Sequence, residues 1–387
     1  MSVIIELKKS GTHRYLTGHP WIYASEIEKI KGDPTAQETV RVKDSRGRWV
    51  GSGLFSPKSE IRVRLFSAEA KVFTGDLLRE RLAIALNRRE RKIRNCNRLV
   101  WSEADGLPGL IVDRYGQSIV FQILQAGMEA RRQQIIESLD KIFRPQVIIE
   151  RSDAKVRALE GLLPRVEVVK GSYSEPECYQ IGEVKMKIDL LKGQKTGAYL
   201  DQVENYLAVG ALAQGKRILD CFANRGGFAL HCAKNGARKV EAVESSEEAV
   251  KEGKANVLLN GAAVNWHQAN GFDWLREAVT LKKQYDLIIL DPPSFTRTRR
   301  HLREALKGYK EIHVRALQLL AFQGILVTYC CSHHVTLELF EEVIRGAAGD
   351  VKQNLIVKGR HFQSSDHPIL LGMPETEYLK GVVLETV

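Results

Sequence analysis

The strongest constraint on the fold is a repeated pattern of apolar strand, turn and helix that begins near residue 185. Apolar stretches of strand length occur at 217–222, 239–243, 285–290 and 324–329, separated by segments with helical periodicity. Nearly continuous apolar strands that alternate with helices indicate a parallel sheet covered on both faces. Ligands of such sheets bind at the carboxyl ends of the strands, where the strand order reverses. The residues that follow each strand are therefore the candidate site.

The chain is too long, at 387 residues, for one ordinary domain. Residues 1–70 alternate apolar and charged side chains over short stretches, which predicts a small β-rich binding domain. Residues 71–184 mix helical and strand patterns, including a helix at 128–142, and form an expected α+β middle domain. Residues 185–387 form the expected α/β domain. No internal repeat is found.

The balance of charge favours a polyanionic partner. The net charge is +11, and proteins that neutralise phosphates release the counterions condensed on nucleic acids. An inert basic surface would give the same total, but the basic residues are clustered: eight Lys or Arg against two Glu between Arg79 and Arg98, and a second group after residue 296. The first cluster is interpreted as a basic helix, which either contacts RNA or presents a solvated face. No apolar run approaches the roughly 18 residues of a membrane span. Since the start of the chain also lacks the features of a secretory signal, the cytoplasm is the expected location and no membrane partner is expected.

The six cysteines are not arranged as zinc ligands, and no metal site is expected. Most are expected to be buried small hydrophobic residues. The pair Cys330-Cys331 is the exception, because the strand expected at 324–329 delivers it to the candidate site.

The first two strands of the α/β domain end in residues suited to an adenosine-type cofactor. The first is followed by a turn that contains Gly226 and Gly227, where the backbone can approach a ligand beside a helix N-terminus. The turn is not G-x-G-x-x-G, which disfavours a dinucleotide. Glu244 ends the second strand and can accept both ribose hydroxyl protons. Asn270, after the next strand, is interpreted either as an adenine contact or as a polar turn residue.

The fourth strand ends in Asp291-Pro292-Pro293-Ser294-Phe295. The two prolines fix the backbone and remove two N–H donors, which leaves carbonyl groups to accept from a substrate amine or a base edge. A proline pair can also simply end a strand. Asp291 at the rim favours a functional interpretation.

The whole chain resembles bacterial 23S ribosomal RNA cytosine-C5 methyltransferases, a family of class I S-adenosylmethionine-dependent enzymes with an N-terminal PUA domain. The resemblance is carried, in family order, by HPWIYASEI at 19–27, SEADGLPGLIVDRYG at 102–116, KTGAYLDQVENY at 195–206, DCFANRGGF at 220–228, DPPSF at 291–295, KGYKEI at 307–312, TYCCS at 328–332, and DHPILL and EYLKG near the end. It implies that residues 1–70 are a PUA-like RNA-binding domain and that 185–387 are a Rossmann-like methyltransferase domain with a mostly parallel seven-stranded sheet.

The resemblance also implies which residues bind S-adenosylmethionine: Lys195, Thr196, Gly197, Tyr199, Asp201 and Gln202 over the cofactor, Asp220, Ala223 and Gly226 at its methionine end, and Glu244 at its ribose. Asn270 and Asp291 complete the expected cofactor set. The glycine turn departs from the family, with Ala-Asn-Arg-Gly-Gly where relatives usually have Ser-Tyr-Thr-Gly-Gly. Glu244 and Asn270 stand where Asp is commoner. Each change keeps a hydrogen-bonding group, so cofactor binding is expected to survive.

Cytosine C5 is a poor nucleophile, and its methylation requires a thiolate that adds at C6. Because side chains alternate along a strand, one of Cys330 and Cys331 faces the site and the other the core. Alignment with the family's Ser-Cys-Ser motif implies that Cys331 is the nucleophile, with Asp291 binding the base beside it. The base that removes the C5 proton is not identified, since His333 and His334 lie close by but exposed loop histidines are common. Pro292, Pro293, Phe295, Arg297 and Arg300 are the expected substrate contacts, with Phe295 stacking on a flipped base.

Two other functions remain open. Related ribosomal enzymes that methylate guanine share the Asp-Pro-Pro-x-Phe motif but have asparagine where Cys331 lies, so the cysteine favours carbon methylation. A non-catalytic RNA-binding assembly factor would not need the intact cofactor motifs. A small-molecule methyltransferase is disfavoured by the basic N-terminal half. The family further suggests 23S rRNA as the partner and a homodimer as the assembly.

Overall fold

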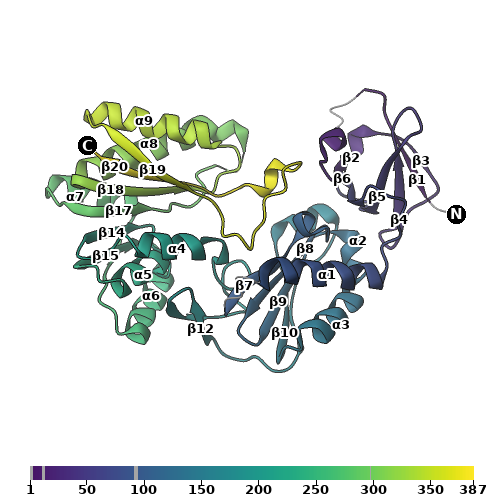
Figure 1. Cartoon of the computed structure of the whole chain (residues 1–387), viewed down its shortest axis with the longest axis horizontal. Helices are drawn as coiled ribbons and strands as arrows, with labels where there is room; N and C mark the ends of the chain where they lie inside the picture. The colour runs from purple at the N-terminus through teal and green to yellow at the C-terminus, as the bar shows by residue number, and fades with distance from the viewer. Residues whose placement is uncertain (1–2, 11–13, 91–94, 297) are drawn as a thin grey trace. The chain divides into compact units, whose positions relative to one another are not determined.

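The computed structural model describes residues 3–10, 14–90, 95–296 and 298–387. It divides into two compact units, and Figure 1 shows the course of the chain through them. The first unit contains Met1–Tyr179, Ile188–Leu200 and Asp366–Thr376, and the second contains Gln180–Lys187, Asp201–Ser365 and Glu377–Val387. The expected boundary at residue 70 lies between β6 (Ile61–Ser67) and α1 (Gly75–Glu90), and the one at 184 falls within the hairpin of β12 (Glu177–Ile181) and β13 (Val184–Ile188). Both boundaries stay predictions.

The first sheet of unit one has six strands in the order β2-β6-β5-β4-β1-β3. Apolar side chains that alternate along these strands meet on one face and form a core around Ile5, Val40 and Val63. The strands are β1 (Ile4–Leu7), β2 (Trp21–Tyr23), β3 (Ile27–Lys31), β4 (Thr39–Lys43), β5 (Trp49–Phe55) and β6 (Ile61–Ser67).

The second sheet of unit one has five strands in the order β11-β10-β9-β8-β7 and packs against three helices. The strands are β7 (Cys96–Trp101), β8 (Leu110–Tyr115), β9 (Ser118–Ile123), β10 (Val147–Ser152) and β11 (Arg165–Lys170). The helices are α1 (Gly75–Glu90), α2 (Ala126–Glu129) and α3 (Arg132–Phe143). The single helix predicted at 128–142 is wrong in one respect: it is interrupted at Arg131, whose backbone leaves the helical region and whose guanidinium donates to the Gly127 carbonyl at 2.6 Å.

The basic segment 79–98 is not one exposed helix, which corrects the sequence-based interpretation. Helix α1 ends at Glu90, and Arg98 lies in β7. Arg89 and Arg98 are buried and form ion pairs with Asp105 at 2.8 Å and Asp113 at 2.7 Å. These guanidinium groups stabilise the middle sheet and have no face to offer a phosphate.

Unit two is built on a seven-stranded sheet in the order β16-β15-β14-β17-β18-β20-β19. The five strands from β16 to β18 are parallel, and β20 is antiparallel to both of its neighbours. The predicted mostly parallel seven-stranded sheet is therefore confirmed. The strands are β14 (Arg217–Cys221), β15 (Lys239–Glu244), β16 (Asn265–Gln268), β17 (Tyr285–Leu290), β18 (Leu320–Cys330), β19 (Leu355–His361) and β20 (Lys380–Thr386).

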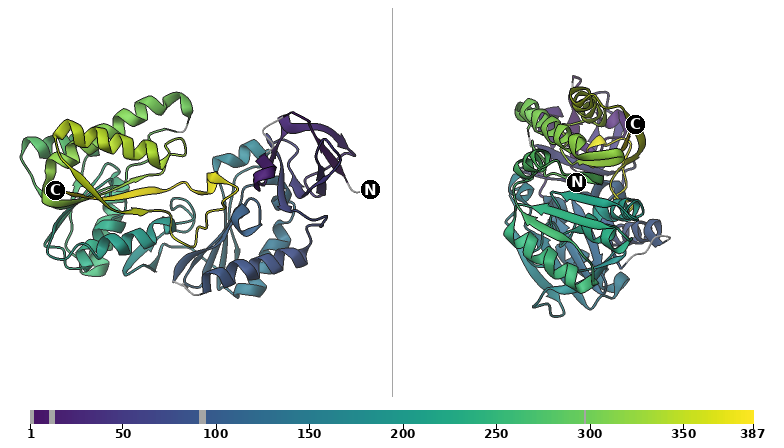
Figure 2. Two further views of the ribbon diagram at one scale, coloured as in Figure 1. Left: turned by 45° about the horizontal axis from the view of Figure 1, so that its top comes forward. Right: turned by 90° about the vertical axis from the view of Figure 1, so that its left-hand side faces the viewer.

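Helices cover both faces of this sheet, as Figures 1 and 2 show. Helices α7, α8 and α9 pack on one face and share one apolar core with the sheet, while α4, α5 and α6 lie on the other. The helices are α4 (Val203–Gly210), α5 (Gly227–Lys234), α6 (Glu247–Asn260), α7 (Gly271–Thr280), α8 (Leu302–Leu319) and α9 (Leu337–Val351). A separate hairpin joins β12 (Glu177–Ile181) and β13 (Val184–Ile188).

Local chemistry fixes where these helices begin and end. The Ser246 hydroxyl accepts from the Ala249 N–H and caps α6, with Glu247 in its first turn. The helix ends at Gly261 in the left-handed conformation, with φ +57°. Throughout the described ranges, no helix has the length and apolar character needed to cross a membrane.

Candidate active site

The carboxyl ends of four adjacent strands bring the predicted site residues of unit two together. In the order β15-β14-β17-β18, the strands end at or just before Glu244, Cys221, Asp291 and Cys331. The order reverses between β14 and β17, because the chain continues from β14 to β15 on one side and reaches β17 on the other. This is the switch point at which open α/β sheets bind ligands.

The turn after β14 has the backbone expected of a close ligand approach. Phe222, Asn224 and Gly226 all have positive φ values, 68°, 49° and 85°. A Cβ at Gly226 would lie 2.9 Å from the Trp266 ring, so only glycine fits there without a shift. Ala223 is buried, and its N–H donates to the Val243 carbonyl at 3.0 Å. Because this N–H is already bonded within the protein, any contact of Ala223 with the cofactor has to be made by another atom of the residue.

Glu244 is held by two backbone N–H groups at the end of β15. Asn224 N donates to its Oε2 at 3.0 Å, and Ser246 N donates to its Oε1 at 2.9 Å. Each carboxylate oxygen can accept more than one hydrogen bond. The carboxylate is thus fixed in orientation and keeps the capacity to accept a pair of ribose hydroxyls.

Asp220 is fully buried in β14 and carries an incomplete set of hydrogen bonds. Its Oδ2 accepts from Ala229 N at 2.9 Å, while its Oδ1 has no hydrogen-bond partner among the described residues. Burial raises the pKa of Asp220 to about 8, and the negative charges of Asp291 and Glu244 act in the same direction. Three carboxyl groups at one edge of the sheet favour a cationic ligand group among them, such as the methionine end of S-adenosylmethionine.

Gln202 orients Asp291 from the start of α4. Its Nε2 donates to Asp291 Oδ2 at 2.9 Å, and its Oε1 accepts from Asn205 Nδ2 at 2.6 Å. Gln202 was predicted to contact the cofactor. In the structure its side chain instead holds the Asp291 carboxylate in place, and the cofactor contact stays a prediction. The neighbouring Asp201 accepts from the Tyr378 hydroxyl at 2.7 Å.

The remaining predicted cofactor residues of the KTGAYLDQ motif, Lys195 to Tyr199, belong to unit one. Thr196 is buried there, and its hydroxyl donates to Asp113 Oδ2. The Ala198 N–H donates to the Tyr115 hydroxyl at 3.0 Å, and the Lys195 ammonium lies 4.5 Å from the centroid of the Tyr199 ring. The Thr196 side chain thus fastens this segment, including Gly197, to strand β8. The cofactor contacts of Lys195, Thr196, Gly197 and Tyr199 stay predictions.

Asn270 is the N-cap of α7. Its Oδ1 accepts from the Phe272 N–H at 2.9 Å, which uses the amide oxygen. The structure therefore supports the polar turn interpretation. A contact from its Nδ2 to an adenine edge stays a prediction.

The two adjacent cysteines have different surroundings. Cys330, the last residue of β18, is fully buried, and its thiol lies 3.4 Å from the Tyr309 hydroxyl. Cys331 is partly exposed, one residue beyond the strand. The alternation predicted from the sequence is thus present, with Cys330 in the core and Cys331 at the rim.

A group of polar residues contacts Ser332, the residue after Cys331. The Ser332 hydroxyl lies 2.9 Å from that of Ser294 and 3.1 Å from that of Tyr309. Lys380, which is buried at the start of β20, donates to the Ser332 carbonyl at 3.0 Å. Burial lowers the pKa of the Lys380 ammonium, and Cys330 and Cys331 act in the opposite direction.

Sequence reasoning gave Tyr309, Ser332 and Lys380 no role. All three lie in stretches that carry the family resemblance, KGYKEI, TYCCS and EYLKG. Those motifs were the only signal available, because the partners of these residues lie 23 to 48 positions away.

The predicted substrate residues differ in exposure. Pro292 is buried, Pro293 and Arg300 are exposed, and Arg297 lies outside the described residues. The Phe295 ring packs against Tyr309, with centroids 4.5 Å apart, and against Phe272 at 5.6 Å. Part of this ring belongs to the α7–α8 core, and its stacking on a base stays a prediction.

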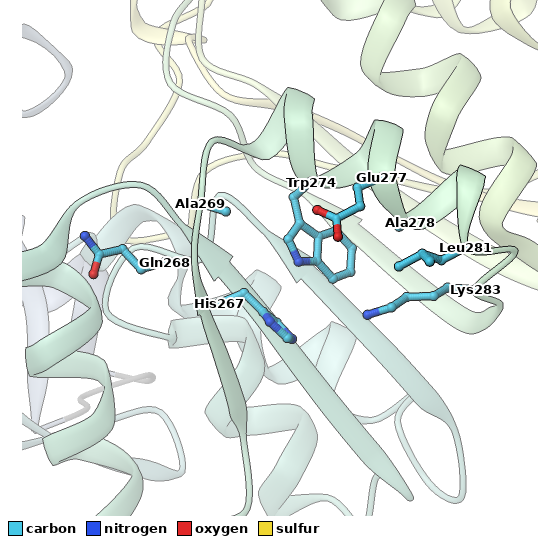
Figure 3. Close-up of a pocket in the computed structure, with 8 residues that line it drawn as sticks. All are labelled: His267, Gln268, Ala269, Trp274, Glu277, Ala278, Leu281 and Lys283. Atoms are coloured by element: carbon cyan, nitrogen blue, oxygen red, sulfur yellow. The ribbon is translucent and has the colours of Figure 1, made fainter.

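A pocket of about 340 Å³ is formed by residues of β16, of α7 and of the segments that directly follow them. It is lined by His267, Gln268, Ala269, Trp274, Glu277, Ala278, Leu281 and Lys283. Figure 3 shows Lys283 beside the Trp274 ring, and the ammonium lies 4.6 Å from the ring centroid. Lys283 also forms an ion pair with Glu241 at 3.0 Å. None of the predicted cofactor residues lines this pocket.

Comparison with known proteins finds a family match for two parts of the chain. A family model described as a PUA-like domain matches residues 5–68, and one described as an S-adenosylmethionine-dependent methyltransferase matches residues 167–354. The ribosomal RNA large subunit methyltransferase I of Tolumonas auensis is 37% identical, with all of both chains covered. The enzyme of the same name from Aeromonas salmonicida is 38% identical over 99% of each chain.

Solved structures share the fold over the full length. A putative S-adenosylmethionine-dependent methyltransferase from Streptococcus mutans has a TM-score of 0.84 at 18% identity, with both chains fully covered. A putative methyltransferase complexed with SAH has a TM-score of 0.85 at 18% identity, again over both full chains.

The sheet order, the glycine turn, the acid after the second strand and the two family matches define an S-adenosylmethionine-dependent methyltransferase with an N-terminal PUA-like domain. The cofactor is S-adenosylmethionine. More narrowly, the chain belongs to the ribosomal RNA large subunit methyltransferase I family.

Proposed function

We propose that this protein methylates C5 of a cytosine in 23S ribosomal RNA through a covalent bond between Cys331 and C6 of the base. The observation that carries the proposal is the position of Cys331, which is partly exposed directly after β18, next to the strand β17 that ends just before Asp291. The names of the curated relatives support a large-subunit ribosomal RNA as the substrate. We further propose a homodimer, for which the resemblance to the family is the only support.

Residues of unit two would hold the cofactor. Glu244 would accept hydrogen bonds from the ribose hydroxyls. Asp220 would pair with the positively charged group at the methionine end of the cofactor. The absence of a side chain at Gly226 would let the cofactor approach the protein backbone closely. S-adenosylmethionine supplies the methyl group.

The residues around Cys331 would carry out the remaining chemistry. The Cys331 thiolate forms a bond to C6, and the electron pair displaced from the C5–C6 double bond makes C5 nucleophilic towards the methyl group. Asp291, oriented by Gln202, would accept from the exocyclic amine of the base and, as a carboxylic acid, donate to N3. Removal of the C5 proton then restores the double bond and expels the thiolate.

RNA that contains 5-fluorocytosine tests the proposal directly. Fluorine at C5 cannot leave as a proton would, so the methylated base should remain bonded to the protein. We expect a stable protein–RNA adduct that forms only with S-adenosylmethionine and maps by mass spectrometry to Cys331. Methyl transfer to ordinary RNA with no adduct on the fluorinated RNA would refute the cysteine mechanism and favour a ring nitrogen as the acceptor.

Cofactor binding should depend on pH through Asp220. Its pKa is raised to about 8 in the protein without cofactor, and a cationic ligand group binds the ionised carboxylate more tightly. The dissociation constant of S-adenosylmethionine should therefore fall by up to about tenfold per pH unit as the pH rises towards 8, and then level off. Isothermal titration calorimetry between pH 6 and 9 measures this.

The variant Asp220→Asn should bind the cofactor more weakly and lose this pH dependence. Asp273→Asn is the matched control, because the Asp273 side chain is 72% exposed on α7. Wild-type affinity that stays constant from pH 6 to 8 would contradict the assignment of Asp220.

A further inference from the structure

Lys380 carries a buried ammonium group that the proposed chemistry does not use. It is the first residue of β20 and is 4% exposed. Buried ammonium groups are costly and are normally paired with a carboxylate. Among the residues that the structure describes, Lys380 forms no ion pair with a carboxylate: the exposed Glu377 influences it from a distance, and less than Cys330 and Cys331 do. The charge of Lys380 therefore needs another explanation.

The sheet and one hydrogen bond place this ammonium at the segment that carries Cys331. In the antiparallel pairing of β18 with β20, Lys380 lies opposite Cys330. Its Nζ donates to the Ser332 carbonyl at 3.0 Å. Ser332 directly follows Cys331, and consecutive Cα atoms are about 3.8 Å apart. The ammonium is thus fixed against the backbone of the nucleophile's own segment, and it can donate more than this one hydrogen bond.

The other described titratable groups at this end of the sheet offer a thiolate less. Burial, and after it a negative charge on Cys330, raises the pKa of Tyr309, so its hydroxyl stays neutral. Carboxylates repel a thiolate, and histidines carry charge only when protonated. These groups come from the end of β17, from α8 and from the segments that follow β18 and precede β20: Asp291, Tyr309, His333, His334 and Glu377. Lys380 is the buried cation beside them.

We propose that Lys380 is a positioning residue for methyl transfer, whose ammonium holds the segment after β18 in place and stabilises the negative charge of the Cys331 thiolate. The thiol proton leaves to solvent, while the ammonium keeps its own. A nearby cation raises the fraction of a cysteine that is ionised near neutral pH, and the thiolate is the form that attacks. The inference rests on the proposed function, in which Cys331 is the nucleophile, and adds the group that keeps it ionised.

A purely structural role explains less of this arrangement. A neutral amide could donate to the Ser332 carbonyl without the cost of burying a charge. Burial lowers the pKa of the Lys380 ammonium, and negative charge on Cys330 or Cys331 acts in the opposite direction. The same attraction acts on the thiols, because the interaction of two charges is mutual. Cys330 is fully buried while Cys331 is partly exposed, so of the two thiols it is Cys331 that can meet a substrate.

Alkylation of Cys331 by iodoacetamide, measured against pH in the full-length protein without RNA or cofactor, tests the inference. The thiolate is the reacting form, so the rate follows its fraction. When the reaction is followed at the Cys331 peptide by mass spectrometry, the midpoint of the pH profile should rise by about one pH unit in Lys380→Met. The rate of methyl transfer at pH 7 should fall by up to about tenfold in this variant and recover at higher pH.

Two further variants separate charge from structure. Lys380→Gln loses the charge but keeps a donor for the Ser332 carbonyl, and it should raise the midpoint as Lys380→Met does. Lys358→Met is the matched control, because Lys358 of β19 is 52% exposed and pairs with Glu385 at 2.9 Å. Its midpoint should equal that of the wild type. The exposed Cys178 is an internal reference whose profile should not move, and thermal unfolding shows whether each variant is folded.

The outcomes separate this inference from the proposed function. Wild-type midpoints in both Lys380 variants would overturn it. A rise in Lys380→Met alone would also overturn it, because the hydrogen bond and not the charge would then be the cause. An equal rise in Lys358→Met would do the same, since only the total charge of the protein would matter. Alkylation uses neither cofactor nor RNA, so its result is independent of adduct formation on fluorinated RNA.

Discussion

Replacing Cys331 with alanine is expected to lower the rate of methyl transfer by at least about a thousandfold, because the thiolate that activates C5 is removed. Cofactor affinity should change little, since the proposed cofactor contacts come from β14 and β15. Single-turnover transfer of a labelled methyl group to protein-free 23S RNA measures the rate. Cys331→Ser should be similarly inactive, because a hydroxyl is far less ionised than a thiol near neutral pH.

Cys330→Ala is the matched control for this experiment. Cys330 is fully buried, and its thiol contacts the Tyr309 hydroxyl. Its loss should cost about 1 kcal/mol of stability and leave the rate within severalfold of the wild type. Loss of activity only in Cys330→Ala would mean that the core cysteine is the nucleophile. Full activity in both variants would favour direct attack by a ring nitrogen of guanine.

The sequence predicted the parts of the site that depend on local pattern. Buried parallel strands are continuously apolar, so the polar residue that follows each one is visible, as with Glu244 and Asp291. Alternation along β18 separated Cys330 from Cys331 in the same way. Strands β19 and β20 were not located. Strand β19 is largely exposed and mixes apolar with polar residues, and the buried β20 has polar residues at both ends, so neither has the continuous apolar pattern of the parallel strands.

Contacts between distant parts of the chain could not be predicted. The run of arginines at 79–98 looked like one basic helix, yet Arg98 belongs to a strand and binds Asp113, 15 residues away. Thr196 was assigned to the cofactor by resemblance, but its hydroxyl contacts Asp113, 83 residues away. Pattern reasoning shows which residues are polar and near a strand end, and it does not show which buried partner each one meets.

Replacing Arg64 with methionine is expected to destabilise unit one by about 3–5 kcal/mol, because it leaves two buried carboxylates without their cation. Arg64 of β6 pairs with Glu103 at 2.9 Å and with Glu160 at 3.0 Å. The three side chains are 8%, 5% and 1% exposed. Methionine keeps the apolar stem and removes the charge and the hydrogen-bond donors that contact the two carboxylates. Thermal unfolding, together with hydrogen exchange of the β6 amides, measures the loss.

The control is Arg79→Met, which breaks an ion pair with Asp76 on α1 in which the two side chains are 43% and 91% exposed. Exposed pairs contribute less than about 1 kcal/mol, so the two variants should differ clearly. Equal losses of stability in the two variants would mean that the removal of a positive charge, and not the burial of the ion pair, causes the loss.

The pH dependence of the Arg64→Met effect identifies its cause. In the wild type, burial tends to raise the pKa of Glu103, but the charge of Arg64 and the hydrogen bonds from Ser102 and Trp21 hold it below its usual value. Stability from a lowered pKa is present near neutral pH and is lost as the pH falls through that value. In the variant, the unpaired carboxylates gain protons more readily, so acid relieves the penalty. The stability difference should therefore narrow as the pH falls from 7 towards 4, and a difference that stays constant over this range would show that lost packing is its cause.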